Sequence, residues 1–331
     1  MRTSLGVALA GAALVAGPLA LPAAAAPAAA SPGPTTVVSG LAGPLHVSYD
    51  HAEDALYVAD AFTGTIYRAD PETGEKTKVP GGKFADGTFV GSVDGAPDGG
   101  LYVVLTRPGD GGQAPTALVH ISASGKKEVV ANLLRYERAH NPDRQPLDTP
   151  DTQSNPYDVL AVRGGALVAD AAGNDVLFVS DSGKVRTLTV LPVSRSGDCA
   201  DVENNGVAGG GCDPVPTDLA MGADGFLYVS GLGAEVEGFI WKVDPADGRI
   251  VQTWRGLPPL TGVAVDRSGN LYGSSLFAGS IIRITPDGDR SGIAVPGPTG
   301  LALHDGRLYA GSLDLSGASP STVQELGVWA F

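Results

Sequence analysis

Several kinds of residue are scarce in this chain, and each shortage excludes a class of site or partner. Only two of the 331 residues are cysteine and five are histidine, and neither type shows the CxxC or HExxH spacing of metal centres. The GxSxG motif of serine hydrolases is missing, as is a GxGxxG motif placed after a strand. Basic residues number 22 against 36 acidic ones, and the net charge of −14 would repel nucleic acid and anionic membranes. The sequence therefore predicts no nucleic-acid partner.

Long apolar runs are confined to the first thirty residues. Arg2 is followed by the apolar run Leu5 to Leu21 and the alanine-rich Ala23 to Ala30, the three parts of a secretory signal peptide. The run is interrupted by glycine and Pro18 and is too short to span a bilayer comfortably. We expect residues 1–30 to be removed, leaving a secreted, extracellular monomer without stable membrane insertion. The alternative is an uncleaved N-terminal anchor.

Glycine and proline, in contrast, are abundant and evenly spread. There are 47 glycines and 25 prolines, which suits many short strands joined by tight turns and does not suit long helices. With 43% hydrophobic residues, the chain is able to bury a sizeable core. The composition therefore favours an all-β fold.

One strand–turn–strand pattern recurs along the chain. Residues 55–70 align without a gap on residues 165–180, and each reads as two apolar strands around a turn that contains glycine. A hairpin repeated in this way must stack on its neighbours to bury both faces. Six copies predict a six-bladed β-propeller over residues 31–331, with hairpins near 55–70, 100–121, 165–180, 225–243, 269–284 and 306–328.

The last copy lacks its fourth strand. After the sixth hairpin begins, the chain offers only Val323 to Trp329 and then ends. The segment from Val38 to Asp50 resembles Trp254 to Asp266, where a fourth strand leads into the next blade. We expect Thr35 to Ser39 to complete the last blade and close the ring, because closure removes an exposed strand edge.

Every long insertion falls on the same side of the predicted ring. In a propeller, the loops after each second strand and the links between blades share one face, which we call the insertion face. Loops on a rigid scaffold are where binding sites collect, so we expect the site over the channel mouth on this face. Its insertions are Thr106 to Thr116, Leu133 to Gln153, Pro192 to Pro214, Leu232 to Gly238 and Leu313 to Ser321.

The two cysteines lie within one of these insertions. Cys199 and Cys212 flank a glycine-rich stretch, and in an exported protein such a pair predicts a disulfide. We expect the bridge to keep a peripheral loop in shape and to be dispensable for the fold. The lack of a CxxC motif or a nearby histidine argues against a thiolate metal site.

The second insertion and the strands after it carry a resemblance to a known family. The matching residues are Glu137, Asn141 to Asp143, Asp151, Ser154 to Tyr157, Ala169 to Asn174 and Val215 to Thr217. In these the chain resembles the ScyD/ScyE family of secreted β-propellers related to NHL-repeat proteins. The resemblance covers essentially the whole mature chain and implies a secreted propeller; it implies no catalytic residues.

Residues at the channel mouth form the candidate binding set: His46, Glu137, Asn141, Asp143, Asn155, Tyr157 and Asp218. Oxygen atoms of Glu137, Asn155 and Asp218 are the type of ligand that Ca²⁺ prefers. This arrangement resembles sugar lactonases of the SMP-30/gluconolactonase type, which hold a channel cation with Glu, Asn and Asp. The alternative is that Asn155 and Asp218 bond backbone groups between blades, as Asp60 and Asp170 are expected to do at their turns.

Two main functions remain open from the sequence. The first is recognition of a small molecule, glycan or protein on the insertion face, with no chemistry and no certain cofactor. The second is metal-dependent hydrolysis of the lactonase type, with Ca²⁺ as the possible cofactor. A third, a quinone-cofactor dehydrogenase, would need basic residues at the channel, and the insertions offer only Arg135, Arg138, Arg144 and Arg195.

Overall fold

The computed structural model describes residues 33–106, 116–145, 154–204 and 206–331. In these residues twenty-four strands form six antiparallel sheets of four strands each, which confirms the predicted six-bladed β-propeller. The chain divides into two units after Ser31, and the expected signal peptide, residues 1–30, lies outside the described residues. No helix in the described part is long and apolar enough to cross a membrane.

The strands of each blade are given below in order from the innermost to the outermost. The first three blades consist of β2 (Pro44–Asp50), β3 (Ala55–Asp60), β4 (Thr65–Ala69) and β5 (Lys76–Lys83); β6 (Phe89–Gly95), β7 (Leu101–Thr106), β8 (Ala117–Ile121) and β9 (Lys127–Asn132); and β10 (Pro156–Val162), β11 (Gly165–Asp170), β12 (Asp175–Ser180) and β13 (Val185–Val190). The last three consist of β14 (Pro216–Met221), β15 (Leu227–Gly231), β16 (Gly238–Val243) and β17 (Ile250–Leu257); β18 (Gly262–Val265), β19 (Leu271–Ser275), β20 (Ser280–Ile284) and β21 (Arg290–Ala294); and β22 (Pro298–His304), β23 (Arg307–Ser312), β24 (Ser321–Gly327) and β1 (Thr35–Leu41). The helical segments are α1 (Leu133–His140) and the short turns η2 (Gly197–Cys199), η3 (Gly233–Glu235) and η4 (Val328–Ala330).

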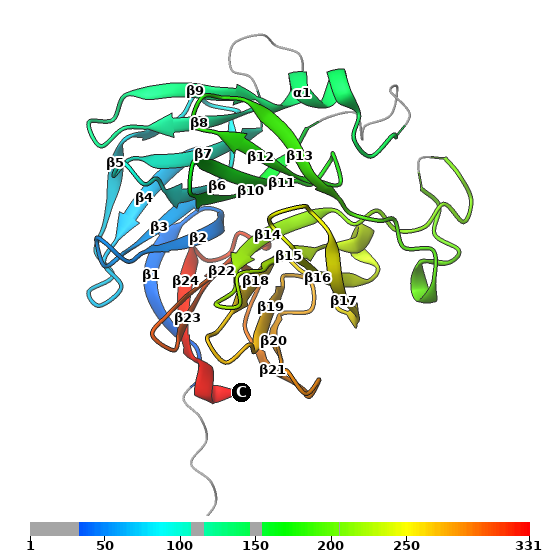
Figure 1. The fold of residues 1–331 in the computed structure, drawn as a ribbon. Coiled ribbons are helices and arrows are strands. Elements are labelled where there is room, and N and C mark those ends of the chain that lie inside the picture. Colours follow the sequence, from blue (N-terminus) through cyan, green and yellow to red (C-terminus); the bar gives the residue numbers. More distant parts are fainter. Residues whose placement is uncertain (1–32, 107–115, 146–153, 205) are drawn as a thin grey trace, which may run out of the picture. The chain divides into compact units, whose positions relative to one another are not determined.

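The two ends of the described chain meet in one blade. Strand β1, blue in Figure 1, pairs antiparallel with β24, in red, through partners such as Thr35 with Glu325 and Val38 with Val323. Strand β1 is therefore the outer strand of the sixth blade, as predicted for Thr35 to Ser39. It closes the ring because it covers the edge that β24 would otherwise expose.

The hydrophobic core lies between blades rather than at the centre of the ring. In β3, Leu56 and Val58 pack towards the sixth blade, while Tyr57 and Ala59 pack towards the second. Successive side chains of a strand point to opposite faces, so a strand between two neighbouring blades is buried on both. This explains why all six residues of β3 are buried. It also explains why such strands read as continuous apolar runs.

The loops after the second strands and the links between blades lie on one side, as the strand order requires. This insertion face carries α1, η2 and η3. Residues 107–115 and 146–153, within two of the predicted insertions, lie outside the described residues. The opposite face, called the turn face below, carries only short connections within the blades and η4.

Cys199 and Cys212 form the predicted disulfide, with Cα atoms 5.2 Å apart. The expectation that the bridge is peripheral is wrong. Both cysteines are fully buried and belong to the core between the third and fourth blades, beside Leu191, Phe239 and Trp241. The insertion folds back into this core, against which its Val202 also packs. The bridge therefore stabilises an interface between blades.

Candidate functional site

Three buried polar side chains meet in the central channel. His46 of β2 places its Nε2 atom 3.0 Å from Asp158 of β10 and 3.5 Å from Asp218 of β14. All three residues are at least nine-tenths buried. Among the described residues, only this trio offers one ligand-type atom per residue with all three within 4.8 Å of one another.

The trio holds the inner strands of all six blades together. Asp158 accepts hydrogen bonds from Ser92 Oγ of β6 at 2.6 Å and from the Leu219 backbone N–H of β14 at 2.8 Å. Asp218 Oδ2 accepts the backbone N–H groups of Val263 in β18 at 2.9 Å and Leu301 in β22 at 3.3 Å. With His46 in β2, every inner strand is joined to one network. Buried carboxylates satisfied in this way fix a unique arrangement of their neighbours.

The electrostatics of the trio favour an ion pair. Burial opposes the charge on His46, but the Asp158 and Asp218 carboxylates hold its pKa well above the ordinary value. Burial also disfavours the Asp158 carboxylate, yet the neighbouring imidazolium keeps the pKa of Asp158 below its usual range. Burial and the charge of Asp158 raise the pKa of Asp218 to about 7. The arrangement is a charged brace across the channel, and a cation there would have to displace the proton of His46.

The three channel residues share a pattern that is visible in the sequence. Each lies two positions after the proline that begins its strand, and a register shift separates the two: Pro44 and His46, Pro156 and Asp158, Pro216 and Asp218. A β-bulge of this kind re-aims the following side chain, here towards the channel. His46 and Asp218 were predicted from the sequence, whereas Asp158 was missed; the shared Pro-x-His/Asp spacing would have identified it.

The structure separates the predicted calcium ligands. Asp218 lies in the channel trio, whereas Glu137 lies on α1 beside Asp170 and Asp175 of the turn between β11 and β12. The backbone N–H of Asn155 donates to Asp170 Oδ1 at 2.7 Å, and the Asn155 side chain accepts from Thr106 at 2.9 Å. The set of Glu137, Asn155 and Asp218 is therefore not one constellation, and the alternative of backbone bonding describes the observed contacts of Asp218 and Asp170.

The other predicted residues also divide between two places. Asn141 and Asp143 follow α1 and lie with Glu137 over the third blade; Asn174 Nδ2 donates to Asp143 at 3.1 Å. Tyr157 lies at the channel mouth, with its ring centroid 6.2 Å from that of Phe89. The insertion face thus has two features of interest, a carboxylate cluster around α1 and an apolar channel mouth.

The channel mouth is lined by apolar side chains from several blades. Leu45, Ala61 and Leu313 are buried there, and Phe89, Tyr157 and Leu276 pack against them. On the same face, large apolar side chains of three adjacent blades are exposed to solvent. Their exposed fractions are 61% for Phe62, 55% for Phe277 and 67% for Leu315. Two hollows, of about 550 and 490 Å³, flank the loop from Leu313 to Pro320. Exposed apolar groups collected beside hollows are typical of interaction sites.

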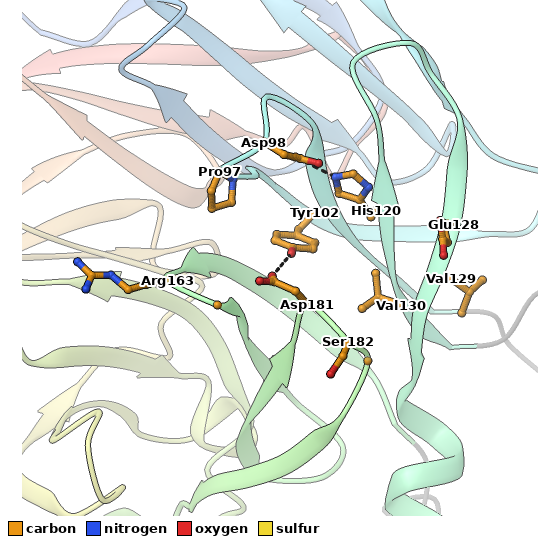
Figure 2. Close-up of a pocket in the computed structure, with 12 residues that line it drawn as sticks. Pro97, Asp98, Tyr102, His120, Glu128, Val129, Val130, Arg163, Asp181 and Ser182 are labelled. Atoms are coloured by element: carbon orange, nitrogen blue, oxygen red, sulfur yellow. Dashed lines mark hydrogen bonds and ion pairs between the residues drawn. The ribbon is translucent and has the colours of Figure 1, made fainter.

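A further hollow, of about 640 Å³, lies on the turn face between the second and third blades (Figure 2). The Tyr102 hydroxyl donates to Asp181 at 2.9 Å, and His120 lies 3.1 Å from Asp98. Tyrosines of other second strands bond aspartates in the first turn of their own blade, as Tyr228 does with Asp224 and Tyr272 with Asp266, whereas Tyr102 reaches the neighbouring blade. We place the candidate site on the insertion face, where the long insertions and the exposed apolar side chains lie.

Comparisons with known proteins agree with the fold. No protein-family model and no curated protein matches the chain. Three solved structures that it resembles are a calcium-binding protein, regucalcin, from Agrobacterium tumefaciens (14% identity, 90% of this chain and 94% of that chain, TM-score 0.58), a gluconolactonase from Xanthomonas campestris (17%, 88% and 88%, 0.58) and a PQQ-bound aldose sugar dehydrogenase from Streptomyces coelicolor (15%, 88% and 96%, 0.58). Identities this low show a shared propeller fold and nothing finer.

Proposed function

We propose that this chain is an exported recognition protein that binds its ligand on the insertion face, over the channel mouth, and catalyses no reaction there. Export is supported by the signal-peptide pattern of residues 1–30 and by the Cys199–Cys212 disulfide, because such bridges form in oxidising compartments. The residues quoted above also support our proposal that the chain is a member of the ScyD/ScyE family.

The observation that carries the recognition function is the apolar mouth. Phe62, Phe277 and Leu315 follow the second strands of the first, fifth and sixth blades, which are neighbours in the ring. A ligand with an apolar surface would bury these side chains at about 25 cal/mol per Å² of apolar area. The ring faces of a glycan, an apolar small molecule and a protein segment all meet this requirement.

The proposal is tested with protein purified from its culture medium. Native mass spectrometry would identify molecules that remain bound, and a variant with Phe62, Phe277 and Leu315 all changed to serine should lose them. The matched control is Trp329→Ser, which removes an apolar side chain that is 64% exposed on the turn face. A triple variant that retains the bound molecule as well as the parent does would rule out the mouth as the site.

A second candidate function is metal-dependent lactone hydrolysis in the channel. It is favoured by the close approach of donor atoms in His46, Asp158 and Asp218. It is opposed by the ion pair, since a cation ligand must be a neutral imidazole. The measurement is hydrolysis of glucono-δ-lactone with Ca²⁺, Mg²⁺ or Zn²⁺ added. Cation-dependent turnover that disappears in Asp218→Asn and persists in Asp98→Asn, on the turn face, would establish this function instead.

A further inference from the structure

Four carboxylates gather where α1 meets the turn between β11 and β12. Glu137 belongs to α1, Asp143 follows it, and Asp170 and Asp175 end β11 and begin β12. Three of them surround Gly173: a Cβ atom at that position would lie 3.3 Å from Glu137 Oε2, 3.4 Å from Asp175 Oδ1 and 3.5 Å from Asp170 Cγ. A side chain at this position would therefore point into the space that these carboxylates share.

Several oxygen atoms of this cluster are buried without a partner. Glu137 is 3% exposed and Asp175 is fully buried, yet Glu137 Oε1 and Asp175 Oδ1 accept no hydrogen bond from any described residue. The side-chain oxygen of Asn141, one turn beyond Glu137, is also buried and unpartnered. Each buried acceptor left in this state costs about 1–3 kcal/mol, and more if it is charged. Such groups are explained by a bound water or ion, by stored strain or by a catalytic role, and the grouping of three of them here favours an ion.

The charge of the cluster is also unbalanced. Within the described residues, no lysine or arginine forms an ion pair with Glu137, Asp170 or Asp175. Glu137, Asp170 and Asp175 therefore lie together with no basic partner among the described residues.

The first blade shows that the turn itself does not need these acids. Residues 60–65 form the same turn with the same register, in which Asp60 pairs with Thr65 as Asp170 pairs with Asp175. Asp60 accepts the backbone N–H groups of Ala42 and Gly43, just as Asp170 accepts that of Asn155. The turn geometry shared by the two blades thus accounts for Asp170. It does not account for Asp175, which stands where the first blade has a neutral threonine.

We infer that this cluster binds a divalent cation of the Ca²⁺ type, with ligands from Glu137, Asp175, Asp143 and the side-chain oxygen of Asn141. Ca²⁺ accepts carboxylate and amide oxygens in flexible geometry, whereas Mg²⁺ requires a stricter octahedron. The carboxylates are spaced more widely than the channel trio. The side chains of Glu137 and Asp175 must therefore rotate inwards to complete the site, which their unpartnered oxygens leave them free to do.

Such a cation would fasten the long insertion to the blade beneath it. Links already observed in the described residues include the bonds of Asn174 to Asp143 at 3.1 Å and to the Val215 backbone at 3.2 Å, and that of the Tyr136 hydroxyl to Thr187. Asn174 thereby also touches the link into the fourth blade. A cation between α1 and the turn would order three segments of the insertion face at once. The site is independent of the ligand proposed for the apolar mouth.

The experiment measures Ca²⁺ binding to the full mature chain after treatment with EDTA. Isothermal titration should give one Ca²⁺ per chain, and at about 100 times Kd the melting temperature should rise by several degrees. Mg²⁺ should bind more weakly. Trypsin cleavage after the exposed Arg144 should slow when Ca²⁺ is present, because the insertion is held against the blade.

Three variants test the ligands. Glu137→Gln, Asp175→Thr and Asn141→Gly should each lose most of the Ca²⁺ response; the second installs the residue of the first blade, and the third keeps the left-handed backbone of Asn141. Without cation, Glu137→Gln should melt above the parent at neutral pH, because the buried amide stays neutral without taking up a proton on folding. Glu128→Gln, an exposed acid of β9, is the matched control and should respond as the parent does. The inference is overturned if the intact protein binds no Ca²⁺ by titration, or if the three variants keep the parent's response.

Discussion

His46 and Asp158 form an ion pair across the channel between blades that are not neighbours. The Nε2 and Oδ1 atoms are 3.0 Å apart, and the pair joins β2 of the first blade to β10 of the third. Adjacent blades are already held by their shared apolar layers, so this pair adds a connection that packing alone does not make. The centre of the ring is thus organised by charge and its periphery by burial of apolar surface.

Removing Asp158 from the channel trio should lower the free energy of unfolding. Asp158→Ala removes the partner of a buried imidazolium and the acceptor of two hydrogen bonds from β6 and β14. Losing one member of a buried pair typically costs about 3–5 kcal/mol. The measurement is urea unfolding monitored by circular dichroism. Asp98→Ala disrupts an exposed pair with His120 and should cost about 1 kcal/mol or less. Equal losses in the two variants would contradict the assigned role.

Stability should fall as the pH rises through the neutral range. The folded pKa of Asp218 is about 7 and that of Glu137 about 8, against ordinary values of 3.8 and 4.5. The folded protein therefore holds protons that the unfolded chain has released, and the stability this contributes is lost as pH rises towards these values. The raised pKa of His46 acts in the same direction above its ordinary value of 6.5.

In EDTA, we accordingly expect a higher melting temperature near pH 5 than near pH 8. At still lower pH the trend should reverse, because the lowered pKa of Asp158 contributes stability that is lost as that carboxylate becomes protonated. Thermal melts across a pH series measure this profile. Asp218→Asn should flatten its slope between about pH 4 and pH 7. A profile that rises steadily from pH 5 to pH 8 would show that these groups do not hold the protons assigned to them.

Removing the disulfide should destabilise the fold as well as the insertion. Changing both Cys199 and Cys212 to alanine removes a cross-link and buried sulfur atoms from the core between the third and fourth blades. We expect a loss of about 2–5 kcal/mol by chemical denaturation. Protease cleavage between Asp198 and Asp213 should increase in the same variant. A loss confined to protease sensitivity, with unchanged unfolding, would restore the peripheral role first expected.

Closure of the ring can be tested within a single strand. Leu41 of β1 is 3% exposed in the core between the sixth and first blades, and Leu41→Ala should cost about 2–5 kcal/mol. Thr36, in the same strand, accepts an exposed hydrogen bond from Gln324 at 2.9 Å. Thr36→Ala should change stability by less than about 0.5 kcal/mol. Similar melting temperatures for both variants would indicate that β1 contributes little to closure.

The blades were predictable from the sequence because their pattern is periodic. Residues 55–70 and 165–180 align without a gap and fold into the same hairpin, and the missing strand of the sixth blade was identified at Thr35. Each copy of the hairpin must bury both of its faces against its neighbours, so the local sequence pattern and the global fold agree.

The candidate sites were harder to predict because they depend on departures from that period. Asp158 faces the channel only after a bulge that shifts its register relative to Pro156. Glu137 was grouped with Asp218, yet α1 places it over the outer turn that holds Asp175 instead. No repeat in the sequence determines where an insertion lies. For the same reason the disulfide was predicted to be peripheral, although it is buried.

Pairing of β1 with β24 has a consequence for how the chain is made. The first described strand pairs with β24, far along the chain, so this pairing must wait until residues 321–327 have been synthesised. Until then Val38 and Leu41 lack the layer that buries them, and the growing blades expose an open edge. Final assembly of the ring is therefore a late and long-range event, and such contacts form slowly. A chain that stalls before its last strand would remain an open arc, prone to pair with another copy along that edge.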